Sequence, residues 1–267
     1  MKKQIASTLL SLPLVLWAGG DIAPLDTEII PQVNTVTEKA WDYEFEVYMF
    51  ASGIDGKSNF GNLAGDVSIS FLDDTIPNLK LGGMARIEAH HKSGWGYWLD
   101  YGFMNLGNSN DVSIVGIHAN TDVGLFQGVL EGAILNRSAL ENGYIDYFVG
   151  FRWWDNDYDM AVRIGNVIDK SRSRSEDWVD GFVGARWTRP LNDNWSFRTR
   201  GDIGAGAADF TAILSAGVLY KITESLELDL RYKALWVDYE TSTKGTQSYY
   251  RYDTVTHGPL FGLTLKF

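Results

Sequence analysis

The chain has 267 residues, no cysteine, 13% aromatic residues and a formal net charge of −11 at pH 7. The acidic excess argues against electrostatic binding to nucleic acid, and the lack of cysteine excludes disulfides and thiolate metal sites within the chain. No segment after residue 20 has eighteen consecutive apolar residues, so a membrane-spanning helix is not expected.

The first twenty residues have the pattern of a secretory signal peptide. Lys2 and Lys3 precede an apolar run too short to span a membrane, and small residues follow at 18–20. Residues 21–40 contain two prolines and no sustained hydrophobic period. We predict that they form a flexible periplasmic segment; a segment that plugs the following domain is the alternative.

From residue 41 onward, ten segments alternate apolar and polar residues, the period of a strand with two different faces. They cover 41–53, 79–91, 95–106, 122–136, 144–155, 178–189, 195–206, 210–220, 225–239 and 257–267. Connections alternate between short and long, except for one short link near Ala207, with the long ones at 54–78, 107–121, 156–177 and 240–256. This predicts a closed, antiparallel, all-β transmembrane barrel over residues 41–267. Residues 65–72 and 111–118 could be further strands, which leaves twelve strands, or eight, as alternatives to ten.

The aromatic residues favour a membrane barrel over a soluble sandwich, which would show the same alternation. Aromatic rings with a polar edge prefer the level of the lipid headgroups. One set falls on the apolar face at one end of the segments, and the other lies near the opposite end. The predicted membrane girdles contain Trp41, Trp95, Trp187, Trp195, Tyr220 and Phe267 at the periplasmic end, and Trp153 and Trp236 at the outer end.

The polar faces project a nearly balanced set of charges into the predicted lumen. The lining residues are Glu44, Glu46, Arg86, Glu88, Asp100, Glu131, Asp146, Arg152, Asp180, Arg186, Arg198, Arg200, Asp202, Glu227, Asp229, Arg231 and Lys233. Eight-stranded barrels are filled by side chains, whereas sixteen strands leave a channel. Ten strands therefore predict a largely filled interior held by ion pairs, and a narrow pore for small solutes is the alternative.

The last eleven residues alternate large apolar side chains at Phe261, Leu263 and Leu265 and end on Phe267. They resemble the closing strand of Gram-negative outer-membrane β-barrels, whose terminal aromatic is part of the insertion signal. Residues 82–84, 178–186, 198–204, 231–239 and 258–262 resemble a group of small, largely uncharacterised barrels of that kind. The resemblance implies the outer membrane as location, with membrane lipid, lipopolysaccharide and the barrel-insertion machinery as partners. It implies no catalytic residues.

Few residues suggest metal binding or catalysis. His90 and His91 are adjacent, so in a strand they face opposite sides and cannot bind one ion together. Asp238 and His257 could form a dyad at the outer end, but no nucleophile accompanies them. We therefore expect no cofactor, no metal and no enzymatic activity, with an outer-membrane hydrolase as the least favoured alternative. The expected role is structural or one of surface interaction.

Overall fold

The structure, a computed structural model, describes residues 39–60, 63–70, 72–73, 76–114, 117–164, 168–244, 246 and 248–267. The predicted signal peptide and nearly all of the segment 21–40 lie outside the described residues, so both stay predictions. Lys39–Phe267 form one compact unit. Within the described residues, no helix has the length and apolar character needed to cross a membrane.

The described part of the compact unit is almost entirely β-structure. Its elements are β1 (Trp41–Phe50), β2 (Gly53–Phe60), β3 (Leu63–Ile69), α1 (Ile76–Asn78), β4 (Leu79–His91), β5 (Trp95–Ile114), β6 (Ile117–Leu140), β7 (Gly143–Ile164), β8 (Ile168–Pro190), β9 (Trp195–Gly206), β10 (Phe210–Thr223), β11 (Leu226–Thr241) and β12 (Tyr250–Lys266).

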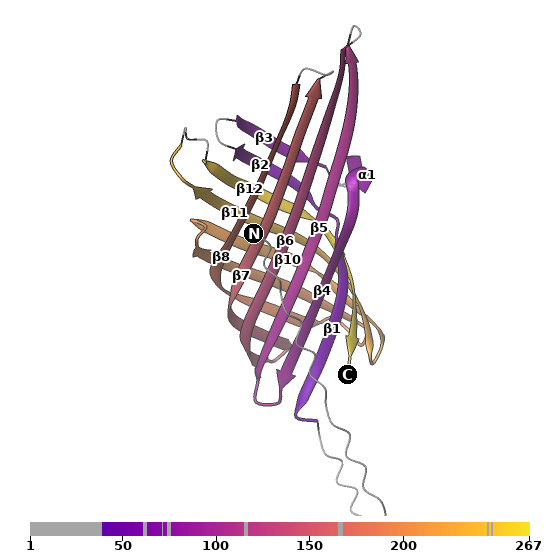
Figure 1. The fold of residues 1–267 in the computed structure, drawn as a ribbon. Coiled ribbons are helices and arrows are strands. Elements are labelled where there is room, and N and C mark those ends of the chain that lie inside the picture. Colours follow the sequence, from indigo (N-terminus) through magenta and orange to yellow (C-terminus); the bar gives the residue numbers. More distant parts are fainter. Residues whose placement is uncertain are drawn as a thin grey trace, which may run out of the picture. The chain divides into compact units, whose positions relative to one another are not determined.

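Ten of these strands close into an antiparallel barrel. β1 pairs with β4, the strands β4 to β12 follow one another in chain order, and β12 returns to β1 over Glu44↔Lys266 to Phe50↔Leu260 (Figure 1). The predicted fold and strand number are confirmed. Short turns join β4 to β5, β6 to β7, β8 to β9 and β10 to β11 at one end, here called the turn end. The opposite end is called the loop end.

Two predicted loops are instead continuations of strands, which corrects the interpretation of 107–121 and 156–177. The β5–β6 ladder continues to Ile114↔Ile117, and the β7–β8 ladder continues to Ile164↔Ile168. The described residues of 111–118 therefore belong to the β5–β6 hairpin and add no strand to the barrel. Beyond the lipid no face must be apolar, so the alternation fades from the sequence while pairing still satisfies the backbone groups.

The predicted loop 54–78 contains a hairpin. β1 and β2 run along β12 in one register, since Phe50 faces Leu260 and Gly53 faces His257. β3 then folds back on β2. Residues 65–72 thus overlap a strand, but it lies outside the ten-strand barrel. The last seven residues of the predicted loop 240–256 are likewise the start of β12, which begins at Tyr250.

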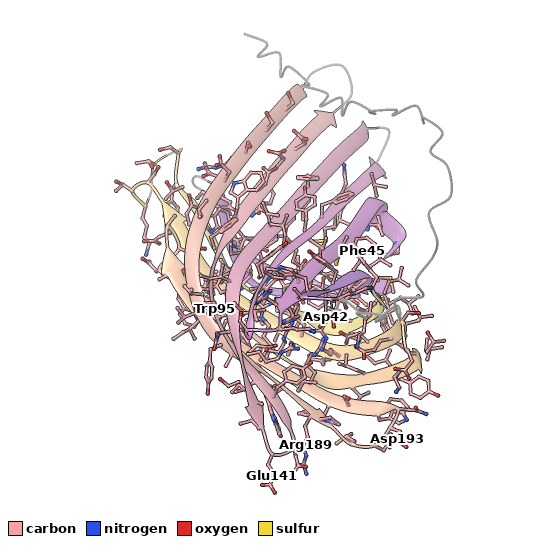
Figure 2. The ribbon with its side chains drawn as sticks, turned by 90° about the horizontal axis from the view of Figure 1, so that it is seen from below. Asp42, Phe45, Trp95, Glu141, Arg189 and Asp193 are labelled. Atoms are coloured by element: carbon pink, nitrogen blue, oxygen red, sulfur yellow. The ribbon has the colours of Figure 1, made fainter. Side chains whose placement is uncertain are left out.

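The two faces of the barrel are reversed relative to a soluble protein. On the outer face of β12, Phe261, Leu263 and Leu265 are about half exposed, at 45%, 45% and 50%. On the inner face, Asp146 and Arg152 are fully buried. The turn end carries exposed charged side chains, such as Glu141, Arg189 and Asp193 (Figure 2). They lie beyond the band of apolar outer-face residues, here called the apolar belt. An apolar exterior around a charged interior is the arrangement of a membrane-spanning barrel.

Candidate functional site

The strand registers place the seventeen predicted lumen residues on the inner face. Fourteen of them are buried, and Glu44, Arg231 and Lys233 keep intermediate exposure. Strand parity explains this placement, because each residue lies an even number of positions from other inner residues of its strand. The described part of the lumen contains clusters of ion pairs, two aromatic clusters and a cavity.

The first charged cluster lies towards the turn end and is called the Glu88 cluster. It comprises Arg86, Glu88, His90, Arg137, Asp146 and Arg186. The guanidinium of Arg186 on β8 donates from Nη1 to Glu88 on β4 at 2.8 Å and from Nη2 to Asp146 at 2.8 Å. Because four strand steps separate β4 from β8, this contact crosses the lumen.

A second group of ion pairs, called the Glu131 cluster, also joins strands that are not neighbours in the sheet. It contains Glu131, Arg152, Arg200 and Asp202, with Arg152 bound to Glu131 at 2.6 Å and to Asp202 at 3.0 Å. Arg200 binds the same two carboxylates at 2.9 and 2.7 Å. Two acids and two bases therefore neutralise one another. Such mutual pairing offsets the large penalty for removing charges from water.

Aromatic side chains pack between and above the ion pairs. Trp98, Phe148 and Phe182 form a buried cluster beside the guanidinium groups, with Arg200 5.4 Å from the Trp98 ring centroid. Towards the loop end, Trp178 stacks on Tyr239 at 4.0 Å. We call the latter group the outer aromatic cluster, which includes Trp154, Trp178, Tyr239, Tyr250 and Tyr252.

The sequence prediction missed the outer aromatic cluster. Trp154 and Trp178 lie two residues from Arg152 and Asp180, so strand parity assigns them to the lumen. Both are almost fully buried. The sequence therefore contains the signal that places these two tryptophans in the lumen.

Three potential metal ligands lie close together in the Glu88 cluster. One oxygen of Glu88, one of Asp146 and one nitrogen of His90 lie within 4.8 Å of one another. The same carboxylates bind Arg86, Arg137 and Arg186. Three guanidinium groups at these carboxylates suit an ion-pair network better than a divalent cation. His91 points elsewhere and contacts Ser93 at the β4–β5 turn.

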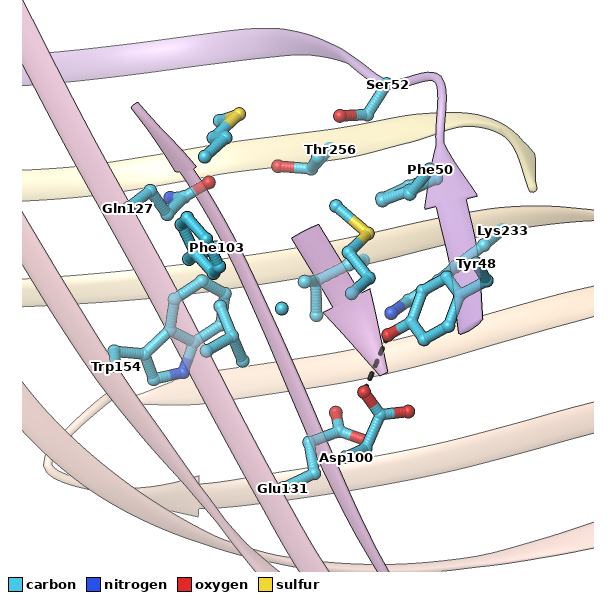
Figure 3. Close-up of a pocket in the computed structure, with 15 residues that line it drawn as sticks. Tyr48, Phe50, Ser52, Asp100, Phe103, Gln127, Glu131, Trp154, Lys233 and Thr256 are labelled. Atoms are coloured by element: carbon cyan, nitrogen blue, oxygen red, sulfur yellow. Dashed lines mark hydrogen bonds between the residues drawn. The ribbon is translucent and has the colours of Figure 1, made fainter. Parts of the chain in front are cut away.

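A cavity of about 560 Å³ of atom-free space, partly open to the exterior, lies beside the outer aromatic cluster. Its base carries Asp100, Glu131 and Lys233, as Figure 3 shows. Tyr48 donates to Asp100 at 2.6 Å. Phe50 and Trp154 contribute to opposite walls (Figure 3). The cavity therefore combines apolar walls with a charged base.

The predicted girdle residues project from the outer face. At the turn end, Tyr43 stacks on Phe267 at 5.9 Å and Trp195 packs against Tyr220 at 4.7 Å. The Tyr43–Phe267 contact joins the first strand to the last residue of the chain. The other predicted girdle residues are Trp41, Trp95 and Trp187 at the turn end, and Trp153 and Trp236 further along the wall.

The predicted Asp238–His257 dyad is wrong. The register places His257 opposite Ala234, four residues from Asp238. His257 lies instead 3.0 Å from the carboxylate of Asp55 and 2.7 Å from the Tyr232 hydroxyl. The sequence does not indicate Asp55 as the partner of His257, because β2, which contains Asp55, lacks the alternation that marks a strand.

Asp55 joins this contact to the β2–β3 hairpin. Ser68 on β3 donates to the Asp55 carboxylate at 2.9 Å. The Ser68 hydrogen bond and then the His257 contact lower the pKa of Asp55 below its usual value of 3.8. Asp55, through its contacts with Ser68 and His257, therefore links the β2–β3 hairpin to β12.

No family model and no curated protein matches this chain. Similar solved structures include Ail of Yersinia pestis, solved with sucrose octasulfate, at 8% identity and a TM-score of 0.38, covering 86% of this chain and 100% of that one. The outer membrane protease OmpT of Escherichia coli has 8% identity, a TM-score of 0.46 and coverages of 85% and 97%. Neisserial surface protein A has 12% identity, a TM-score of 0.30 and coverages of 86% and 98%. The closed ten-strand ladder with its apolar exterior and charged interior gives this chain the outer-membrane β-barrel fold.

Proposed function

We propose that the chain is an integral protein of the Gram-negative outer membrane, with a lumen closed to solutes and a structural or surface-interaction role. The turn end lies in the periplasm, and the loop end lies outside the cell. The observation that carries this proposal is the pair of charged clusters across the lumen. Together with the outer aromatic cluster, they occupy the path that a solute would take.

The height of the apolar belt supports placement in a membrane. On β12, the outer face runs from Phe267 at the turn end to His257, the first polar residue of that face. Ten strand steps of about 3.3 Å, tilted by roughly 40°, rise about 25 Å. This equals the usual height of the lipid-facing band in such barrels.

The projecting hairpins β5–β6 and β7–β8 support a role at the cell surface (Figure 1). In our proposal they extend beyond the belt and offer polar surface to lipopolysaccharide or to another cell. Arg174 on β8 is held by Glu176 and by the carbonyl oxygen of Ser248, so this cation lies at a fixed position. The side chains of Lys170 and Arg172, which precede Arg174 on the same strand, lie outside the described residues.

Conductance in planar bilayers tests the closed lumen. We expect no discrete current steps from the purified protein, while a sixteen-stranded porin inserted under the same conditions conducts. Reproducible steps from the wild-type protein would instead support the narrow pore. Sedimentation with outer membranes and heat-modifiable migration on gels test the location separately, and a mature protein that stays soluble without detergent would contradict it.

The absence of enzymatic activity stays a prediction. A general base needs one ring nitrogen free to accept a proton. Both ring nitrogens of His257 lie within hydrogen-bond distance of partners, Tyr232 and Asp55. This arrangement favours a fastening role for His257 over a catalytic one.

A further inference from the structure

The wall of the barrel is incomplete between β1 and β4. Their ladder starts at Trp41↔His91 and ends at Val47↔Ala85, although both strands continue beyond these residues. Above that level, β1 pairs with β12 alone, and β4 pairs with β5 alone. Six strand steps above Trp41 correspond to roughly 15 Å, so the separation begins near the middle of the belt and extends into its outer half.

The cavity lies at this separation and reaches through the wall. Tyr48 and Phe50 border it from β1, and Met84 borders it from β4. Phe103 lines the same cavity, although it belongs to the outer face of β5 and stacks on outward-facing Tyr101 at 5.9 Å. One cavity bordered by residues of both faces must open laterally, towards the lipid, above Val47↔Ala85.

The walls suit a small amphipathic molecule. The atom-free space of about 560 Å³ includes the part that opens to the exterior, so a ligand lies partly inside the cavity and partly at its opening. Phe50, Met84 and Met104 keep intermediate exposure, in contrast to the buried Trp98 deeper in the lumen. Methionine side chains adapt to ligands of different shape.

Lys233 at the base lacks an acidic partner. Its ammonium lies 5.3 Å from the Phe50 ring centroid, and no acid among the described residues forms an ion pair with it. The two acids of the base are engaged: Asp100 accepts from Tyr48, and Glu131 is bound by two arginines. Among the three charged groups at the base, the ammonium of Lys233 is therefore the one with no hydrogen-bonded partner among the described residues, and Glu131 and Asp100 attract it only from beyond ion-pair distance.

We propose that the cavity binds an anionic alkyl amphiphile that enters from the outer leaflet between β1 and β4. Its carboxylate or phosphate pairs with Lys233, and its hydrocarbon chain lies against Phe50, Met84 and Met104. An anion offsets the penalty of a partly buried, unpaired ammonium, and lateral entry keeps the chain in an apolar medium throughout. The inference rests on the proposed membrane location but not on the closed lumen.

Binding of brominated dodecanoate tests this proposal, because bromine quenches tryptophan on contact and Trp154 lines the cavity. The probe is titrated into the folded protein in a non-ionic detergent, with unbrominated dodecanoate, dodecyl phosphate and dodecanol as competitors. We expect saturable quenching that Trp154→Phe largely removes, and competition at least about tenfold stronger by the two anions than by dodecanol. No saturable quenching, or equal competition by dodecanol, would refute the proposal.

Matched variants isolate the ammonium and the cavity. Lys233→Met should weaken binding of the two anions at least about tenfold and leave the binding of dodecanol unchanged. The control is Lys266→Met, which removes a cation paired with Glu227 at the turn end and should change the binding of neither ligand class. Gly102→Leu, whose Cβ would lie 3.2 Å from Met84, should weaken all ligands. Gly201→Leu is its control, because an added Cβ there meets no atom within 4 Å. Folded Lys233→Met or Gly102→Leu protein that binds dodecanoate like the wild type would overturn the assignment.

Two further measurements identify the source of the ligand and separate the proposed ligand site from the proposed closed lumen. Vesicles with a brominated anionic phospholipid, compared with brominated phosphatidylcholine, show whether a membrane lipid enters the cavity. Quenching by the free acid but not by the vesicle lipid would assign the site to free acids. A protein that conducts ions yet binds dodecanoate would refute the closed lumen alone.

Discussion

Replacing Arg186 by methionine tests whether the Glu88 cluster holds the barrel closed. The Arg186 side chain is 3% exposed and binds the carboxylates of both Glu88 and Asp146. Methionine keeps an unbranched chain in the same space but removes the charge and every donated hydrogen bond. The substitution therefore acts on the ion pairs with little change in packing.

The expected loss of stability follows from the partners that remain. Glu88 keeps Arg86, and Asp146 keeps Arg137 at 2.7 Å, so neither carboxylate is left alone. Removing one partner of a buried ion pair usually costs about 3–5 kcal/mol. We expect the lower end, about 3 kcal/mol, which is roughly a hundredfold change in the ratio of folded to unfolded protein.

Equilibrium unfolding by urea in lipid vesicles, followed by tryptophan fluorescence and by gel migration, measures this loss. The control is Arg189→Met, because Arg189 is exposed at the turn end of the same strand (Figure 2). We expect that control to change the free energy of unfolding by less than about 0.5 kcal/mol. Equal effects of the two substitutions would refute a stabilising role for the cluster. A cycle with Glu88→Gln should give a coupling energy of about 1–3 kcal/mol.

Two further predictions concern the hairpin and a turn. The pKa of Asp55 is lowered by its hydrogen bond from Ser68, so its carboxylate stabilises the hairpin above pH 3.8 and this contribution is lost as the pH falls through the lowered pKa. The protection factors of the β2 and β3 amides, which are corrected for the pH dependence of intrinsic exchange, should therefore be lower at pH 3 than at pH 6, with a smaller difference in Ser68→Ala; equal protection at both pH values would contradict this. Gly143→Ala should lower the free energy of unfolding by about 1–3 kcal/mol, because Gly143 has φ +109° and an added Cβ would lie 2.1 Å from the carbonyl oxygen of Thr188. A change no larger than that of Gly201→Ala would show that the turn relaxes.

Strand parity explains why the barrel was predictable from the sequence. A residue of a strand faces lipid or lumen according to its position, so one aromatic end such as Phe267 orients the whole closing strand. The same rule assigned Glu131 and Arg200 to the interior. It could not pair them, because parity says nothing about which strands face one another across the lumen. Those pairings depend on the closure of β12 on β1 and on the shear of the ladder.

The hairpin β2–β3 was beyond the reach of the same rule. Its strands do not have to present one face to lipid. No apolar alternation marks β2, and residues 65–72, which overlap β3, suggest only that a further strand is an alternative. Their register follows from β12, which extends past Gly258 and offers its edge to β2. A free strand edge is paired or covered in most proteins. The partner of Asp55 therefore becomes visible only when β12 and β2 are aligned.

The same extension explains how the proposed closed lumen and the proposed opening between β1 and β4 fit in one barrel. From Tyr43 to Val47, β1 is bonded on both edges, so the barrel is closed where the Glu88 cluster crosses it. Above Val47, β1 and β2 follow β12, and the chain returns through β3 before β4 begins beside β5. β1 and β4 thus follow different neighbours and separate. Closure at the turn end keeps the barrel intact, and an opening towards lipid becomes possible in the loop half without a channel through the membrane.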